Sequence, residues 1–342
     1  MAKQHLDPAA GPVAGDTLEA YLQTQATEFL RALRQHRETG GSTASSGNGT
    51  EETVDAARAL RRSARRISGT LHTFRPLLDT DWSEGIRPEL AWLSGTLARE
   101  HAYAARLERL LGALNRLSGC SPIPAQTASE PRQEKSTLTV GAAKAGALLE
   151  RQLTLARTRA HSAALQALGS SRFHAVADSV AVLASEVPLS PAATSAGLKP
   201  LAAAAEDRLT DAITALPLVS AGHPYNAEAL VHGLSADPAP QPQDAPWHQV
   251  RLLLRLHRYA LEVLYGTESP VDVRVLNAGQ ALDRHRDAAE AATAAASAAR
   301  TPRIAPATAY ALGVLHADQR HEVEAARFAF RQAWLRETVS TS

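Results

Sequence analysis

The chain has 342 residues, enough for one large domain or two smaller ones. Hydrophobic residues make up 44% and aromatic residues 4%, so the core has to be built from Leu, Ala and Val, which favours helix over sheet. The single cysteine, Cys120, excludes an internal disulfide and a zinc site with several cysteines. With no apolar run of 18 residues and no signal-peptide core, we expect a cytoplasmic protein without a membrane span.

The net charge of +1 excludes a polycation, but the basic residues are unevenly chosen, with 32 Arg and 4 Lys. A GC-rich genome favours Arg over Lys without any functional reason. Arg is also the better phosphate ligand, because its planar donors match two oxygens at once. Composition does not separate these two causes, so the placement of the arginines along the helices has to decide.

The first half of the chain predicts four helices separated by polar loops. Residues 1–15 have the composition of a flexible tail. Good N-cap residues and apolar periodicity then predict helices from near Asp16 or Thr17, and over about 53–78, 86–117 and 143–168. Segments rich in Gly, Ser, Thr and Pro predict flexible loops near 38–52 and 118–137.

The second half repeats this scheme. After a short helix at 172–185, the pattern predicts helices at 198–216, 246–265, 271–299 and 306–337, with a flexible loop near 233–246. No segment shows the alternation of a strand. We therefore predict an all-α fold with eight principal helices, in a single domain over 16–338 made of two helical halves, about 16–170 and 171–338.

Five arginines form a stripe on the second predicted helix: Arg58, Arg61, Arg62, Arg65 and Arg66. At about 100° per residue they lie within an arc of about 140° and span about 12 Å along the axis. Within the helix, no acidic residue between Ala56 and Leu78 neutralises them. Like charges in one stripe are unfavourable, so they either pair with carboxylates of other helices or bind an anion.

A second stripe lies on the helix predicted at 246–265, within an arc of about 100°: His248, Arg251, Arg255, Arg258 and Tyr259. Leucines surround it, so we expect the rest of the helix to be buried. Glu262 lies on the same side, four residues after Arg258, and is expected to contact it. A shift of 190 residues superimposes Arg58, Arg61 and Arg65 on His248, Arg251 and Arg255, which indicates an internal repeat.

A third and weaker stripe is formed by Arg320, Arg327 and Arg331 near the C-terminus. A solvated helix face is the simpler interpretation of it, but Arg327 and Arg331 are kept as candidate binding residues. Enzyme signatures are missing, since there is no glycine-rich phosphate loop and no Gly-x-Ser-x-Gly motif. No pair of histidines four residues apart supports a metal site. We expect no catalysis, metal or cofactor.

At these arginine helices the sequence resembles the CHAD (conserved histidine α-helical domain) family, whose repeated pattern is His-x-x-Arg-x-x-x-Arg/Lys-Arg. The second half matches it with His248-Gln249-Val250-Arg251, Arg255 and Arg258-Tyr259-Ala260-Leu261-Glu262. The first half matches with Arg61, Arg65, Arg66, Leu71 and Phe74-Arg75-Pro76-Leu77-Leu78, and the end of the chain with Ala311-Leu312-Gly313 and Phe330-Arg331-Gln332-Ala333-Trp334. The resemblance spans about residues 17–337.

The sequence departs from the family pattern at four places. Arg58 occupies the histidine position of the first half, and Arg62 a position that is usually apolar. Leu256 stands where a second basic residue is common, and Arg99-Glu100-His101-Ala102 lacks the acidic residue of an Arg-x-x-Arg-Asp pattern. These departures indicate a diverged member with altered anion affinity in the first half.

The resemblance implies two four-helix bundles related by a pseudo-twofold, with the basic helices facing a central channel. It also implies binding of inorganic polyphosphate, or a similar polyanion, and association with polyphosphate granules. Some family members carry a triphosphate-hydrolysing domain with a Glu-x-Glu-x-Lys motif, which this sequence lacks. We therefore expect a binding protein rather than a hydrolase.

Three alternatives remain open from the sequence. The arginines of a structural or protein-interaction module would pair internally with Asp and Glu. Nucleic-acid binding is less favoured, because the basic faces lack interleaved aromatic residues and the chain has no positive excess. A phosphatase or polyphosphate-cutting enzyme is least favoured, because the sequence shows no carboxylate cluster for magnesium.

Overall fold

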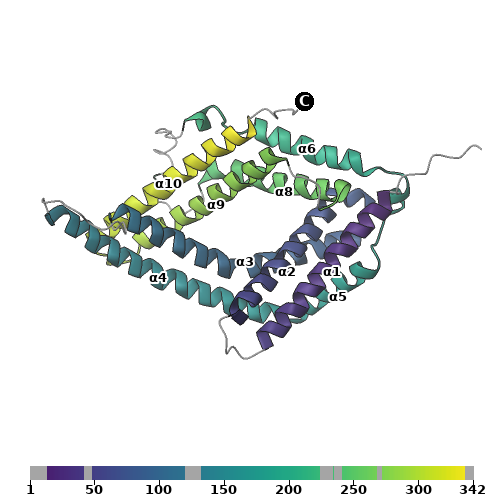
Figure 1. The fold of residues 1–342 in the computed structure, drawn as a ribbon, viewed down its shortest axis with the longest axis horizontal. Helices are drawn as coiled ribbons and strands as arrows, with labels where there is room; N and C mark the ends of the chain where they lie inside the picture. Colours follow the sequence, from purple (N-terminus) through teal and green to yellow (C-terminus); the bar gives the residue numbers. More distant parts are fainter. Residues whose placement is uncertain are drawn as a thin grey trace, which may run out of the picture. The chain divides into compact units, whose positions relative to one another are not determined.

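A computed structural model describes residues 14–41, 48–119, 132–223, 234, 241–267 and 272–335 (Figure 1). Over these residues the fold is all-α, as predicted, and contains no β-strand apart from one isolated bridge between Leu78 and Leu189. The α-helices are α1 Ala14–Gly41, α2 Asn48–Thr73, α3 Thr80–Leu117, α4 Arg132–Leu168, α5 Ser171–Ser185, α6 Leu198–Thr214, α8 Ala245–Tyr265, α9 Val273–Ala299 and α10 Pro306–Trp334. Short 3-10 helices are η1 Arg75–Leu77, η2 Pro191–Thr194, η3 Ser220–Gly222 and η4 Pro242–Asp244.

Several helices are longer than the sequence predicted. α1 continues to Gly41 and α2 begins at Asn48, so helix covers both ends of the loop predicted at 38–52. α4 begins at Arg132, inside the loop predicted at 118–137. Both segments combine Ser, Thr or Gly with residues of high helix propensity, so their composition did not mark where these helices begin. Residues 1–13, 42–47 and 120–131, where the tail and loops were predicted, lie outside the described residues.

α3 also begins earlier than predicted, at Thr80 instead of residue 86. Its start is capped by Asp79, whose carboxylate accepts a hydrogen bond from the backbone N–H of Trp82 at 2.8 Å. Pro88 consequently lies inside the helix rather than in its first turn. The capping residue explains the difference, because it provides a start that hydrophobic periodicity does not show.

The described chain divides into two compact units, each made of three separate stretches of sequence. Unit 1 comprises residues 1–98, 162–209 and 255–270, and unit 2 comprises residues 99–161, 210–254 and 271–342. α3, α4, α6 and α8 each contribute residues to both units. The predicted single domain with halves at about 16–170 and 171–338 stays a prediction. The predicted pair of four-helix bundles, their pseudo-twofold and their central channel stay predictions.

The core of unit 1 is built mainly from α1, α2, α5 and the first half of α3, and α1 lies beside both α2 and α5 (Figure 1). α2 contributes a buried stripe at helical spacing: Leu60, Ala64, Ile67, Leu71 and Phe74 at its end. Each large apolar side chain that is fully buried stabilises the unit by about 1.5–3 kcal/mol. Because this stripe takes one face of α2, its arginines are left on the other faces.

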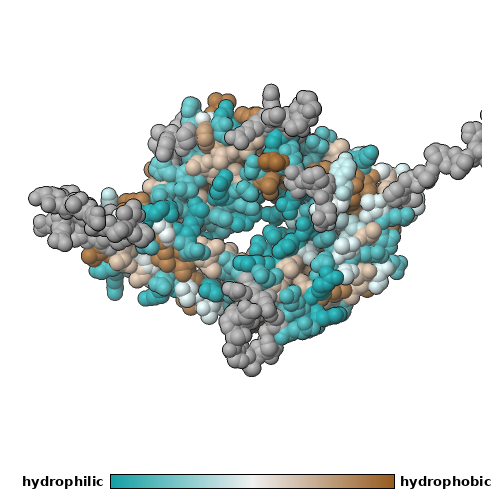
Figure 2. All heavy atoms as spheres, in the orientation of Figure 1, coloured by the Kyte–Doolittle hydropathy of each residue, from teal (hydrophilic) through white to brown (hydrophobic). Residues whose placement is uncertain are grey.

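Unit 2 is built around α9 and α10, which lie side by side (Figure 1). The buried face of α9 is made largely of alanines, including Ala288, Ala291 and Ala295, and such small side chains let helix axes approach closely. Figure 2 shows a largely hydrophilic surface over α9. None of the described helices combines the length and the apolarity that crossing a bilayer requires.

Candidate functional site

The arginine stripe of α2 lies beside the buried face of that helix. Arg58 and Arg62 are exposed, whereas Arg61, Arg65 and Arg66 are half-buried. Arg58 already has a partner one turn before it, because its Nη1 donates to Asp55 Oδ1 at 3.0 Å. An exposed pair of this kind contributes little to stability and remains available to a competing anion.

Glu262 of α8 is the junction between the two predicted stripes within unit 1. Its carboxylate accepts from Arg66 Nε at 2.7 Å and from Arg66 Nη2 at 3.2 Å. Arg258 Nε lies 3.4 Å from Glu262 Oε1, so the contact expected four residues along the helix is confirmed. Tyr21 of α1 donates its hydroxyl to Glu262 Oε2 at 3.0 Å. Three helices therefore meet at one carboxylate.

The surroundings of Glu262 keep Arg66 charged and Tyr21 protonated. Burial opposes the charge on Arg66, but the hydrogen bond and the charge of Glu262 outweigh it and raise the pKa of Arg66. Burial, with Glu262 close by, also raises the pKa of Tyr21, which keeps its phenol protonated as the donor. Both guanidiniums are held in a defined direction, and one negative charge serves two positive ones.

Tyr259 was predicted to contact the anion, a role that stays a prediction, and the structure places its ring against α2. Its side chain is buried, and its Cδ2 lies only 2.6 Å from where a Cβ on Gly69 would stand. The guanidiniums of Arg66 and Arg258 lie 5.9 and 5.8 Å from the ring centroid. The ring therefore packs beneath the two arginines, because α2 approaches α8 closely enough at Gly69 to cover it.

These two helix segments carry a large excess of positive charge. Residues 55–73 of α2 and 255–265 of α8 contain seven arginines, Arg255 among them, and two carboxylates. The excess is five positive charges, while the whole chain has +1. A polyanion is the kind of ligand that such a concentration of cations attracts.

His248 and Arg251, in the N-terminal part of the α8 stripe, lie in unit 2. This part carries less positive charge than the part in unit 1. Arg251 donates from Nε to Asp283 Oδ1 of α9 at 2.6 Å. The ring of His248 is on the surface and meets His285 edge-on, with ring centroids 5.4 Å apart. Partial desolvation lowers the pKa of His248 against the charge of Asp244, and Arg251 adds to the lowering. His248 is therefore mostly neutral at pH 7.

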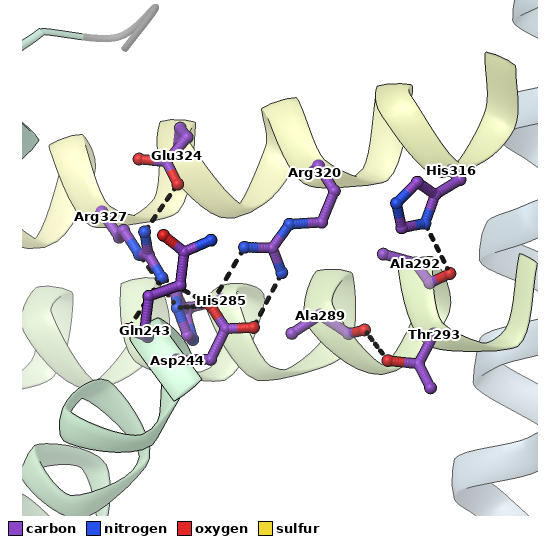
Figure 3. Close-up of polar contacts among 10 residues, drawn as sticks. All are labelled: Gln243, Asp244, His285, Ala289, Ala292, Thr293, His316, Arg320, Glu324 and Arg327. Carbon is purple, nitrogen blue, oxygen red and sulfur yellow. Dashed lines mark hydrogen bonds and ion pairs between the residues drawn. The ribbon is translucent and has the colours of Figure 1, made fainter. Parts of the chain in front are cut away.

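Arg327 was predicted to bind the anion, a role that stays a prediction, and the structure places its side chain in the interior of unit 2. Arg327 is 4% exposed, and its guanidinium is used by Asp244, Glu324 and His285 (Figure 3). Arg320, from the same predicted stripe, is 2% exposed and bound to Asp244. Arg331 is half-buried, and its guanidinium carbon lies 3.2 Å from the Cβ position of Gly222 in η3. Its role in binding stays a prediction.

Sequence reasoning missed Tyr21, Asp244, His285 and Glu324 as partners of these cations. One signal was present for α10, since Arg320, Glu324 and Arg327 repeat at spacings of four and three, the pattern of a single helix face. Asp244 gave none, because it lies in a segment of Pro, Gln and Asp that reads as a loop. No group of three His, Cys, Asp or Glu side chains suited to a metal ion occurs in the described part of the chain.

Comparisons with known proteins identify the family of the chain. The solved structure of PptA from Streptomyces chartreusis is 70% identical in sequence and superimposes with a TM-score of 0.78, over 94% of this chain and 99% of that one. No curated protein matches. The family model of the CHAD domain matches residues 24–296, most of the chain, which confirms the resemblance found in the sequence and supports polyphosphate-related binding at the level of the family. The chain belongs to the CHAD domain family.

Proposed function

We propose that this protein binds inorganic polyphosphate, or a similar polyanion, and does not catalyse a reaction on it. The proposed contacts are the basic side chains of α2 and α8: Arg58, Arg61, Arg62, Arg65, Arg66, His248, Arg251, Arg255 and Arg258. The observation that carries the proposal is the excess of five positive charges on residues 55–73 and 255–265, two segments joined through Glu262. Binding to cytoplasmic polyphosphate granules is part of the same proposal.

The chemistry of the ligand fits such a site. Polyphosphate is a flexible chain of anions without bases, so its recognition requires fixed cations and no reading of a groove. Arginine presents two parallel donors to phosphate oxygens. The ion pairs with Glu262 use Nε and Nη2 of Arg66 and orient the guanidiniums of Arg66 and Arg258. Each phosphate that is neutralised releases condensed counterions, so the affinity has to fall steeply with salt.

A titration of the full chain with fluorescently labelled long-chain polyphosphate tests the proposal. We expect saturable binding at about 50 mM salt and a loss of affinity of at least tenfold at about 200 mM. Orthophosphate release is measured in the same samples and is expected to be absent. Folded protein that does not bind at the lower salt concentration would rule out polyphosphate binding, and steady phosphate release would rule out a non-catalytic role.

A second candidate function is a structural or protein-interaction module, and α10 favours it. There the arginines are internally paired, as Arg320 and Arg327 are with Asp244. If the α2 and α8 arginines also serve only internal pairs, removing them lowers stability and leaves polyanion affinity unchanged. Single-stranded RNA, added as a competitor, separates polyphosphate binding from general affinity for nucleic acids.

A further inference from the structure

A buried group of charged side chains in unit 2 lies at the beginning of α8 (Figure 3). Asp244, directly before the first residue of α8, is 4% exposed and accepts hydrogen bonds from two arginines of α10. Arg320 donates from Nη1 to Oδ2 at 2.8 Å and from Nη2 to Oδ1 at 3.2 Å. Arg327 donates from Nη2 to Oδ1 at 2.5 Å, and its Nη1 to Glu324 at 2.7 Å. Two arginines therefore face two carboxylates.

The two arginines of this group are already paired with its two carboxylates, so the group does not offer a free cation to an outside anion. Burial by itself raises the pKa of Asp244, but the hydrogen bond and charge of Arg320, with the charge of Arg327, lower it on balance. Burial raises the pKa of Glu324 against the charge of Arg327. Removing one member of such a group leaves another buried charge unpaired, which costs several kcal/mol. The group is accordingly rigid.

Arg327 contacts the chain on both sides of the start of α8. Its Nη2 donates to the backbone carbonyl of Gln243 at 3.1 Å, just before the helix. Its guanidinium lies over the ring of Trp247, 5.4 Å from the centroid, in the first turn. Trp247 in turn meets Phe330 of α10 edge-on at 5.6 Å. One arginine thus fixes the backbone and a large side chain where α8 begins.

His285 of α9 extends these contacts to the surface. Its Nε2 accepts from Arg327 Nε at 3.3 Å, its ring stacks on Trp247 at 5.7 Å, and its other neighbour is the ring of His248 at 5.4 Å. Burial, with Arg327 close by, lowers the pKa of His285 to about 3. The ring is therefore neutral, and because Nε2 accepts, the proton is on Nδ1.

We infer that Arg327 and His285 are positioning residues for His248, because together they fix the first turn of α8 and hold the His248 ring from beneath. The inference rests on the proposed function, in which His248 touches the polyanion. It gives the buried arginines of α10 a role in binding although they never meet the ligand. His248 and the polyphosphate are coupled through α9 and α10 rather than through α8 alone.

A double-mutant cycle tests this coupling. Polyphosphate affinity is measured at neutral pH for the wild type, His248→Ala, His285→Gln and the double variant. We expect each single variant to lose about threefold to tenfold in affinity, the size of one charged or well-oriented hydrogen bond. The double variant should lose no more than His248→Ala alone, because His285 acts through His248. His321→Gln, an exposed histidine of α10, is the matched control and should bind as the wild type does.

Losses that multiply in the double variant would show that His285 acts by general packing and would overturn the inference, and so would full affinity in His285→Gln. A wild type that does not bind overturns the proposed function instead, before any variant is measured. If His285→Gln does not fold, nitrogen-15 NMR of the wild-type histidines decides. A proton on Nδ1 of His285 supports the hydrogen bond from Arg327, whereas a proton on Nε2 excludes it.

Discussion

Arg66 of α2 and Glu262 of α8, 196 residues apart in the sequence, form a two-pronged ion pair with N–O distances of 2.7 and 3.2 Å. The same carboxylate also serves Arg258 and Tyr21. Glu262 therefore has two effects on the proposed site. It removes one positive charge from it, and it orients two of the remaining guanidiniums.

Replacing Glu262 by Gln should destabilise the protein. The amide keeps the size of the side chain but loses the charge, so two partly buried guanidiniums face each other and Tyr21 loses a charged acceptor. We expect the free energy of unfolding to fall by about 1–3 kcal/mol, as measured by urea unfolding followed by circular dichroism. Glu28→Gln, which removes the exposed partner of Arg31, is the control and should change it by less than about 1 kcal/mol. Equal changes in the two variants would contradict the role of Glu262.

Replacing Arg62 by Gln should weaken binding and leave stability alone. Arg62 is exposed and makes no hydrogen bond or ion pair within the described residues. We expect the slope of log affinity against log salt to become shallower by about one, because one fewer phosphate is neutralised. The free energy of unfolding should stay within about 0.5 kcal/mol. Arg31→Gln on α1, an equal change of charge in the same unit, should keep the wild-type slope; a common slope change in both would indicate a non-specific effect of net charge.

The sequence predicted the helices well because their apolar stripes, such as Leu60, Ile67 and Leu71 on α2, repeat at the helical period. It also predicted the basic stripes on the remaining faces. It could not tell an exposed arginine from a buried one. Arg327 has one partner on its own helix, Glu324, but its burial also depends on Asp244. That partner lies 83 residues away, a contact that no local pattern encodes.

Local periodicity also does not show which helices are shared between the compact units, as the long helices α3 and α4 are. The burial of Tyr259 had a visible cause, because Gly69 provides space for its ring on α2. A glycine in the middle of a helix, which intrinsic propensity disfavours, was the signal that could have revealed it.

Affinity for polyphosphate should rise as the pH falls below neutrality. His248 has a pKa below the ordinary value of 6.5 in the free protein, and a bound polyanion favours its protonated form. The charges around His248 otherwise offset one another, because Asp244 and Glu290 are acidic and Arg251 and Arg286 are basic. The neighbouring His285 is neutral. Binding should therefore take up protons, which calorimetry in buffers of different ionisation enthalpy detects. His248→Gln should abolish this uptake, and an unchanged uptake would assign it to another group.

His285 should make the protein sensitive to acid. Its pKa is about 3 in the folded chain and near the ordinary 6.5 when unfolded, so the unfolded state binds more protons between these values. The free energy of unfolding should consequently fall as the pH decreases below about 6.5, by up to about 1.4 kcal/mol per pH unit from this residue. Urea unfolding at several pH values down to about 5 measures the slope. His285→Gln should reduce it, although the variant is less stable at pH 7; identical slopes would exclude His285 as the source.

Because Gly69 contacts Tyr259, packing rather than helix propensity decides whether replacing this glycine raises or lowers the free energy of unfolding. An added Cβ at Gly69 would lie 2.6 Å from Tyr259 Cδ2 and 3.2 Å from Leu256 Cδ2, so α2 and α8 would have to separate. We expect Gly69→Ala to lower the free energy of unfolding by about 1–3 kcal/mol in urea, since overpacking outweighs the helix propensity of Ala. Gly95→Ala, in the middle of α3 with nothing within 4 Å of the new Cβ, should instead raise it by about 0.5–1 kcal/mol. A stabilising Gly69→Ala would show that the two helices are not held as closely as this contact requires, and with it the shared anchoring of Arg66 and Arg258 on Glu262 would be in question.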